Sequence, residues 1–148
     1  MKFEKFFKSV GTHGLIVKKS DAESWLVCGG VGMRIPEGVN NLGVSQAPDR
    51  LFTAIVNSDT SDDVLTLKRA VLYEAEGKAK DIIRVFETDL GDEVGIYNAY
   101  FGLIEKKDVL TYLEIEEDDT GIEHKVIIVS DHRGDIIGYI FGTEDFVG

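Results

Sequence analysis

The chain of 148 residues has little of several residue types on which specialised proteins depend: one cysteine, two prolines and three histidines. A single cysteine, Cys28, forms no disulfide within the chain and cannot alone provide a zinc site, so a disulfide scaffold and a zinc finger are excluded. This cysteine usage favours a reducing, intracellular location. Because Cys28 ends an apolar run, we interpret it as a small buried side chain rather than a nucleophile.

Long apolar runs are also absent. The longest, such as Val126–Val129, have four or five residues, whereas a membrane-spanning helix needs about 20. The first residues lack the apolar core and cleavage site of a secretion signal, so we expect neither a membrane anchor nor a leader. Hydrophobic residues make up 43% of the chain, which provides for a core, and the length predicts a single domain over residues 1–148.

Positive charge is scarce after the first third of the chain. Residues 1–50 carry seven Lys and Arg against five Asp and Glu, whereas residues 51–148 carry nine against 22. The second part therefore has a net charge of −13, and the whole chain has −11. Because such a surface repels phosphate groups, we expect protein partners, no nucleic acid and no membrane.

Apolar spacing predicts a short amphipathic helix at the N-terminus. Phe3, Phe6, Phe7 and Val10 recur at helical spacing, and Gly11 is a natural helix end. The stripe packs on the core of its own chain, binds the groove of a partner or lies on a membrane surface; we prefer the first, and the spacing alone leaves the others open.

The remaining patterns predict an α+β fold dominated by antiparallel sheet. Leu15–Lys18 and Trp25–Cys28 alternate around turn residues and indicate a hairpin, whereas residues 31–48, rich in Gly, Asn and Pro, indicate mainly loop. The segment APDRLFTAIVNS predicts a second helix with Pro48 in its first turn. Residues 61–76 fit a helix or a strand, and we prefer the helix, because Thr60 and Asp63 resemble a capping box.

The C-terminal half predicts strands joined by short turns. The segments DIIRVFET and VGIYNAYFGLI favour strands, with DLGDE as the turn between them. The last three apolar segments, DVLTYLEIEE, HKVIIVSD and IIGYIFG, predict an antiparallel meander.

The segment WLVCGGVG, Trp25–Gly32, is the strongest candidate for a phosphate-binding loop. Gly30 and Gly32 match the first two glycines of the dinucleotide motif, but Ile35 occupies the third position and Pro36 follows it. Proline at this point breaks the helix that would hold the pyrophosphate. We therefore interpret the glycines as a bend or turn where another part of the chain approaches closely.

Catalytic and metal-binding patterns are weak. His13, His124 and His132 show no metal-ligand spacing, and Asp131 beside His132 is the best candidate for an acid–base pair. The acidic segments NSDTSDD and EIEEDDTGIE lack the spacing of a calcium loop. We expect no enzyme activity, no cofactor and no metal.

Aromatic residues gather in the segment GIYNAYFG. Tyr97, Tyr100 and Phe101 either form part of the core and its cross-strand pairs or provide an aromatic strip for another protein. Their acidic surroundings disfavour stacking on nucleic acid bases.

Three features occur together: the opening KFFKSVGTHGLIVKK, the loop CGGVGMRIPEGVNN and an acidic, β-rich C-terminal end. In this combination the chain resembles small structural proteins of phages and prophages. The resemblance implies a virion or assembly component, such as a capsid accessory, head–tail joining or tail-completion protein, found in the host cytoplasm or in the virion.

The preferred hypothesis is a non-enzymatic interaction or assembly module that forms a homo-oligomer. Its contacts would come from the N-terminal stripe, the loop Gly29–Gly43 and strand edges. One alternative is an acidic inhibitor that mimics a polyanion at the basic site of a host enzyme, and another is an enzyme that binds a small molecule. The expected contact residues are Phe3, Phe6, Phe7, Gly30, Gly32, Met33, Tyr97 and Tyr100.

Overall fold

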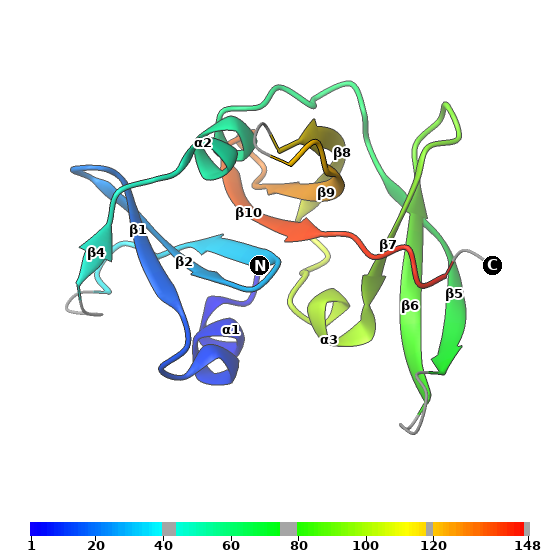
Figure 1. Ribbon diagram of the computed structural model, residues 1–148, viewed down its shortest axis with the longest axis horizontal. Coiled ribbons are helices and arrows are strands. Elements are labelled where there is room, and N and C mark those ends of the chain that lie inside the picture. Colours follow the sequence, from blue (N-terminus) through cyan, green and yellow to red (C-terminus); the bar gives the residue numbers. More distant parts are fainter. Residues whose placement is uncertain (40–43, 75–79, 118–119, 147–148) are drawn as a thin grey trace.

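The computed structural model describes residues 1–39, 44–74, 80–117 and 120–146. In these ranges the chain has an α+β fold with mostly antiparallel sheets and a helix near the N-terminus, as the sequence predicts (Figure 1). The sequence predictions for the loop 29–43, the segment 61–76 and the turn 116–121 each fall in part outside the described residues.

The described chain has three helices and ten strands. The helices are α1 (Phe3–Val10), α2 (Arg50–Val56) and α3 (Asn98–Phe101). The strands are β1 (Leu15–Ser20), β2 (Glu23–Cys28), β3 (Val31–Arg34), β4 (Ser45–Gln46), β5 (Thr66–Glu74), β6 (Lys80–Glu87), β7 (Glu93–Tyr97), β8 (Val109–Glu116), β9 (Glu123–Ser130) and β10 (Ile136–Phe141).

Seven of these strands form one sheet in the order β4-β1-β2-β3-β10-β9-β8. All neighbours are antiparallel except β1 and β4. The predicted β1–β2 hairpin and the predicted meander β8–β9–β10 are confirmed, and β3 joins them by pairing with both β2 and β10. The prediction of loop was wrong for Val31–Arg34, because backbone hydrogen bonds to two flanking strands hold this segment despite its glycine.

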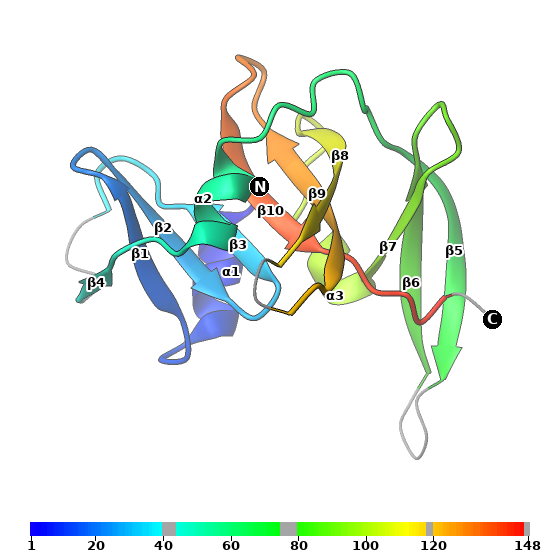
Figure 2. The same ribbon diagram turned by 45° about the horizontal axis from the view of Figure 1, so that its top comes forward.

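The seven-stranded sheet is buried on both faces. Along β9, Val126 and Ile128 pack in a cluster with residues of α2, whereas Ile127 and Val129 pack in a second cluster with residues of α1. Because neighbouring residues of a strand point to opposite faces, α1 and α2 lie on opposite sides of the sheet (Figures 1 and 2).

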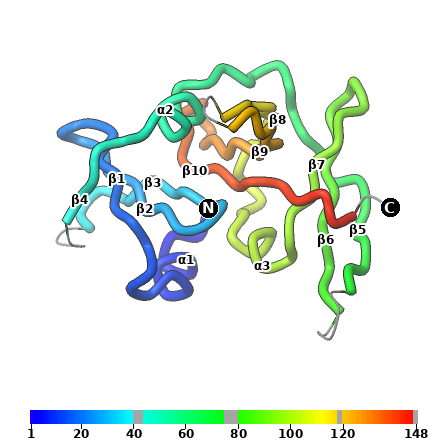
Figure 3. Tube along the Cα trace, viewed as in Figure 1, coloured from blue at the N-terminus to red at the C-terminus, as the bar shows by residue number. Residues whose placement is uncertain are grey.

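Strands β5, β6 and β7 form a separate antiparallel sheet in that order. Phe86, Val94 and Ile96 from this sheet belong to the same buried cluster as the α1 side of the large sheet. On the opposite face, the C-terminal segment after β10 crosses β7 (Figure 3), where Phe146 packs against Gly95 and lies beneath the guanidinium of Arg69. The two sheets therefore share one core.

Local signals account for both predicted helices. Gly11, at φ +59°, ends α1, and its N–H donates to the carbonyl of Phe7. Asp49 caps α2, since its side chain accepts the N–H of Phe52 at 2.7 Å. Pro48 precedes this cap instead of occupying the first turn, because Asp49 ends the extended segment.

The preferred helix over residues 61–76 is wrong, because β5 occupies Thr66–Glu74 and pairs with β6. Thr60, which resembled a helix cap, instead forms a buried hydrogen bond between its hydroxyl and that of Thr111 at 2.6 Å. The contact between Thr60 and Thr111 therefore takes the place of the helix cap that the sequence suggested. Similarly, the predicted strand over residues 94–104 ends at Tyr97, where the short helix α3 begins.

Candidate interaction surfaces

Two of the three predicted contact phenylalanines lie on the outside of α1. Phe7 is 42% exposed and Phe3 is half-buried, and their rings stack with centroids 6.0 Å apart. Phe6 is only 3% exposed and packs in the core with Val10. The prediction that Phe6 is a contact residue is therefore wrong, because this side chain holds α1 on its own chain.

A wide groove of about 680 Å³ lies between α1 and the loop after β3. Its apolar lining includes Phe3, Pro36 and Val39, and the remaining lining residues are Met1, Lys2, Glu4, Lys5, Lys8 and Glu105. We call these nine residues together with Phe7 the α1 surface. The N-terminal stripe and the loop, predicted separately as contacts, thus adjoin in the fold.

The glycine-rich segment forms a hairpin turn. Gly29 and Gly30 connect β2 to β3, Gly29 has φ +58°, and the carbonyl of Gly30 accepts the N–H of Phe141 at 2.7 Å. The interpretation as a bend is confirmed. The turn leads into a strand, so it does not present the helix N-terminus that a dinucleotide-binding loop uses.

Gly32 and Met33 were predicted as contact residues and are buried instead. A Cβ atom at Gly32 would lie 2.2 Å from Cε1 of Tyr139, and Met33 is 2% exposed. Both predictions are wrong, because β3 lies in the middle of a sheet that is covered on both faces. Gly30 is half-buried, against the Cβ of Phe141.

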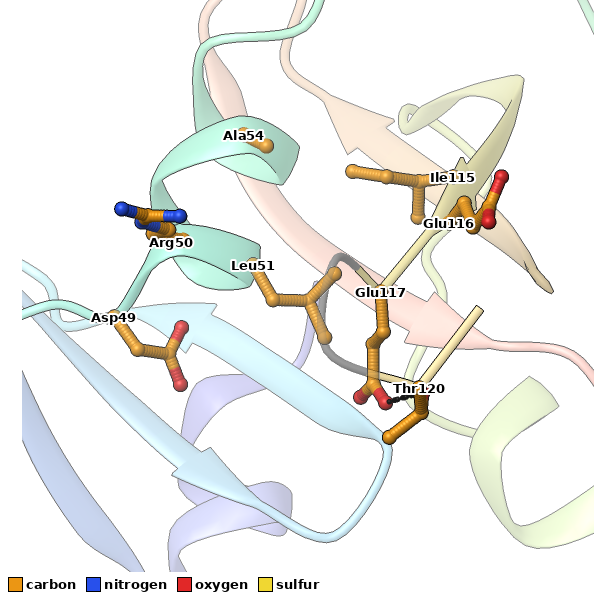
Figure 4. A pocket seen from close by; sticks show the side chains of 8 residues that line it. All are labelled: Asp49, Arg50, Leu51, Ala54, Ile115, Glu116, Glu117 and Thr120. Carbon is orange, nitrogen blue, oxygen red and sulfur yellow. Dashed lines mark hydrogen bonds between the residues drawn. The ribbon is translucent and has the colours of Figure 1, made fainter. Parts of the chain in front are cut away.

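A second groove, of about 550 Å³, lies between α2 and the β8–β9 hairpin (Figure 4). Leu51 and Ala54 from α2 and Ile115 from β8 provide its apolar lining. The other lining residues are Asp49, Arg50, Glu116, Glu117 and Thr120, and we call all eight the α2 groove. Local sequence patterns do not predict this groove, although the acidic segment EIEEDDTGIE supplies half of its lining residues.

Carboxylates crowd the β8–β9 strand pair on the face opposite Ile115 of the α2 groove. Glu116 lies directly opposite Glu123 in the β8–β9 ladder, and Glu114 lies two residues before Glu116 on the same face. The negative charge of Glu114, with a smaller effect from Glu116, raises the pKa of the Glu123 carboxyl. We call Glu114, Glu116 and Glu123 the acidic ridge, a place where charge repulsion outweighs the attraction of nearby Lys125.

The predicted tyrosines form an aromatic cluster. Tyr97 is 6.0 Å from Tyr73 and 6.3 Å from Tyr100 between ring centroids. The Tyr97 hydroxyl donates to Asp145 and accepts from Thr143, and the bond to Asp145 raises the pKa of this tyrosine. Both predicted residues are half-buried, and Tyr97 is held by the chain's own C-terminal segment.

Asp131 holds a tight turn. Its Oδ1 accepts the N–H groups of Arg133 and Asp135 at 2.9 and 3.0 Å, and Oδ2 lies 3.9 Å from Arg34. Partial burial acts to raise the pKa of Asp131, but these hydrogen bonds outweigh it and the pKa is lowered. His132 is exposed beside it, and the two line grooves of about 280 and 260 Å³ whose lining does not include Gly29, Gly30 or Gly32.

Within the described ranges, no hydrogen bond joins a histidine side chain to a hydroxyl group or to Cys28, which is half-buried. No cluster of three or more His, Cys, Asp or Glu residues among those described has an arrangement that could hold a metal ion. None of the described helices has the length and apolar character needed to cross a bilayer.

Comparisons of the chain with protein-family models, with curated proteins and with solved structures find no match. The open surfaces on α1 and beside α2 are therefore the features from which a function can be inferred.

Proposed function

We propose that the protein is a non-enzymatic interaction or assembly module that binds another protein through the α1 surface. One observation carries the proposal: Phe3, Pro36 and Val39 line the groove, Phe7 stacks on Phe3 beside it, and Phe7 and Val39 remain exposed to solvent. Aromatic side chains held on a rigid helix are effective anchors at protein interfaces, since they lose little conformational entropy on binding.

The rim of the α1 surface defines the chemistry of the partner. Lys2, Lys5 and Lys8 lie around the apolar lining, and the Lys5 ammonium also donates to the carbonyl of Gly102 at 3.3 Å. A segment with apolar anchors flanked by carboxylates complements this surface. The resemblance of the opening residues to phage structural proteins is the reason for proposing a virion or assembly component.

The proposal is tested by placing a photo-crosslinking amino acid, p-benzoylphenylalanine, at position 7 and irradiating the protein in extract from its source. We expect covalent protein adducts at this position. The matched control carries the same amino acid at position 90, because Leu90 is 86% exposed and lies in the β6–β7 turn. Equal adducts at both positions, or none at position 7, would contradict the proposal.

The acidic ridge supports a second candidate function, an inhibitor that binds a basic site. Carboxylates that repel one another in the free protein gain from contact with cations. We expect the triple variant Glu114→Gln, Glu116→Gln and Glu123→Gln to bind a polylysine peptide less tightly than a control of equal net charge. The control changes three exposed acids elsewhere, Asp62→Asn, Asp89→Asn and Glu144→Gln. Equal binding by the two variants would rule this candidate out.

A further inference from the structure

The α1 surface and the α2 groove are open, partly apolar sites on opposite faces of the seven-stranded sheet (Figures 1 and 2). They share no lining residue. One molecule can therefore use both at the same time, because occupation of one does not block the other.

The rims of the two sites carry opposite charge. Lysines predominate at the α1 surface, where Lys2, Lys5 and Lys8 face two glutamates, Glu4 and Glu105. Carboxylates predominate at the α2 groove, where Asp49 and Glu117 stand against Arg50, whereas the carboxylate of Glu116 points away from Leu51 and Ala54 (Figure 4). The α2 groove thus offers what the α1 surface requires of a partner, apolar contacts flanked by carboxylates.

We infer that the partner of the α1 surface is a second copy of this chain, whose α2 groove receives Phe3 and Phe7. This inference rests on the proposed function and names its partner. The stacked rings would pack on Leu51, Ala54 and Ile115, while the lysine rim meets the carboxylate rim. Contact between two different surfaces is heterologous, so repetition produces a closed ring or an open filament.

The charge distribution along the chain favours this pairing over like-with-like contacts. Residues 51–148 carry a net charge of −13, so two copies meeting through their α2 grooves or acidic ridges repel each other. Residues 1–50 carry a net charge of +2 and supply the lysines of the α1 surface. Electrostatic steering therefore directs the α1 side of one copy toward the acidic side of the next.

The test is sedimentation velocity on the purified chain over a range of concentrations. We expect wild type to form species larger than a dimer, and Phe7→Ser and Ala54→Trp each to weaken association at least tenfold. An equimolar mixture of these two variants retains one intact pair of surfaces, so it should form a 1:1 dimer and stop there. The control Leu90→Ser should associate like wild type.

A charge exchange separates a folding defect from a lost contact. Lys8→Glu and Glu117→Lys each place like charges across the interface and should weaken association, whereas the double variant in one chain exchanges the charges and should restore it. Lys8 is exposed and Glu117 is half-buried on the groove rim, and neither side chain belongs to the buried core.

The outcomes distinguish the inference from the function on which it rests. Association that survives all four single variants would overturn the inference, and so would a wild-type chain that stays monomeric. In either case the proposed function stands if position 7 still crosslinks to a different protein. A monomeric chain without adducts at position 7 would overturn both.

Discussion

At the residue scale, the packing of β3 depends on a position that has no side chain. Gly32 lets the ring of Tyr139 lie directly against the backbone, and an added Cβ would approach Cε1 to 2.2 Å. We expect Gly32→Ala to lower the free energy of unfolding by about 1–3 kcal/mol, since the buried ring must shift. Chemical denaturation measures this change. In the double variant with Tyr139→Leu the two effects should be less than additive, and full additivity would contradict the explanation.

A buried hydroxyl pair gives a second test. Thr60 and Thr111 are both buried, and their hydroxyl oxygens lie 2.6 Å apart. Thr111→Val should lower the free energy of unfolding by about 1–3 kcal/mol, because it leaves the Thr60 hydroxyl without a partner. Changing both residues to Val should recover part of that loss. A double variant less stable than Thr111→Val would argue against the pairing.

At the scale of elements, α2 depends on its cap. Asp49→Ala removes the acceptor for the N–H of Phe52 and should destabilise the protein by about 1 kcal/mol in thermal or chemical unfolding. Asp49→Asn keeps an acceptor for this N–H, so its stability should stay close to that of wild type. It also removes one carboxylate from the rim of the α2 groove. Equal destabilisation by both variants would show that the charge of Asp49, rather than its cap, stabilises the helix.

The β8–β9 ladder should be more stable when its carboxylates are protonated. The raised pKa of Glu123 means that the folded state favours the protonated form, so this contribution to stability is present at acid pH and is lost as the pH rises through that pKa. Glu123→Gln should therefore raise the melting temperature at neutral pH, and its advantage should shrink as the pH falls through this raised pKa toward the normal range for Glu. An advantage independent of pH would exclude charge repulsion as its cause.

Elements differ in how well the sequence predicted them. The meander and the first hairpin are explained by alternation and turn residues alone, and α1 and α2 by apolar spacing and helix ends. β5 was missed, because its side chains are mainly exposed and its pairing with β6 decides its conformation. β3 was missed for a related reason. It is held by hydrogen bonds to β2, which precedes it, and to β10, which lies about 100 residues further along the chain.

At the scale of the whole molecule, the two open surfaces make association depend on salt. Between about 0.1 M and about 1 M salt, the screening length falls from about 10 Å to about 3 Å. We expect the self-association constant to fall at least tenfold over this range, because the lysine and carboxylate rims lie in solvent. Sedimentation velocity measures the change, and Leu90→Ser again serves as the control. Association that strengthens with salt would indicate an interface without the rim charges.

The sequence by itself determined the α+β class, the helix near the N-terminus, the meander and the uneven distribution of charge, since each follows from local spacing or composition. Only the tertiary structure decided which apolar side chains remain exposed. It buried Phe6, Gly32 and Met33, left Phe7 outside, and brought α2 beside the acidic hairpin. The physical reason is that exposure depends on contacts between segments far apart along the chain, which local patterns do not contain.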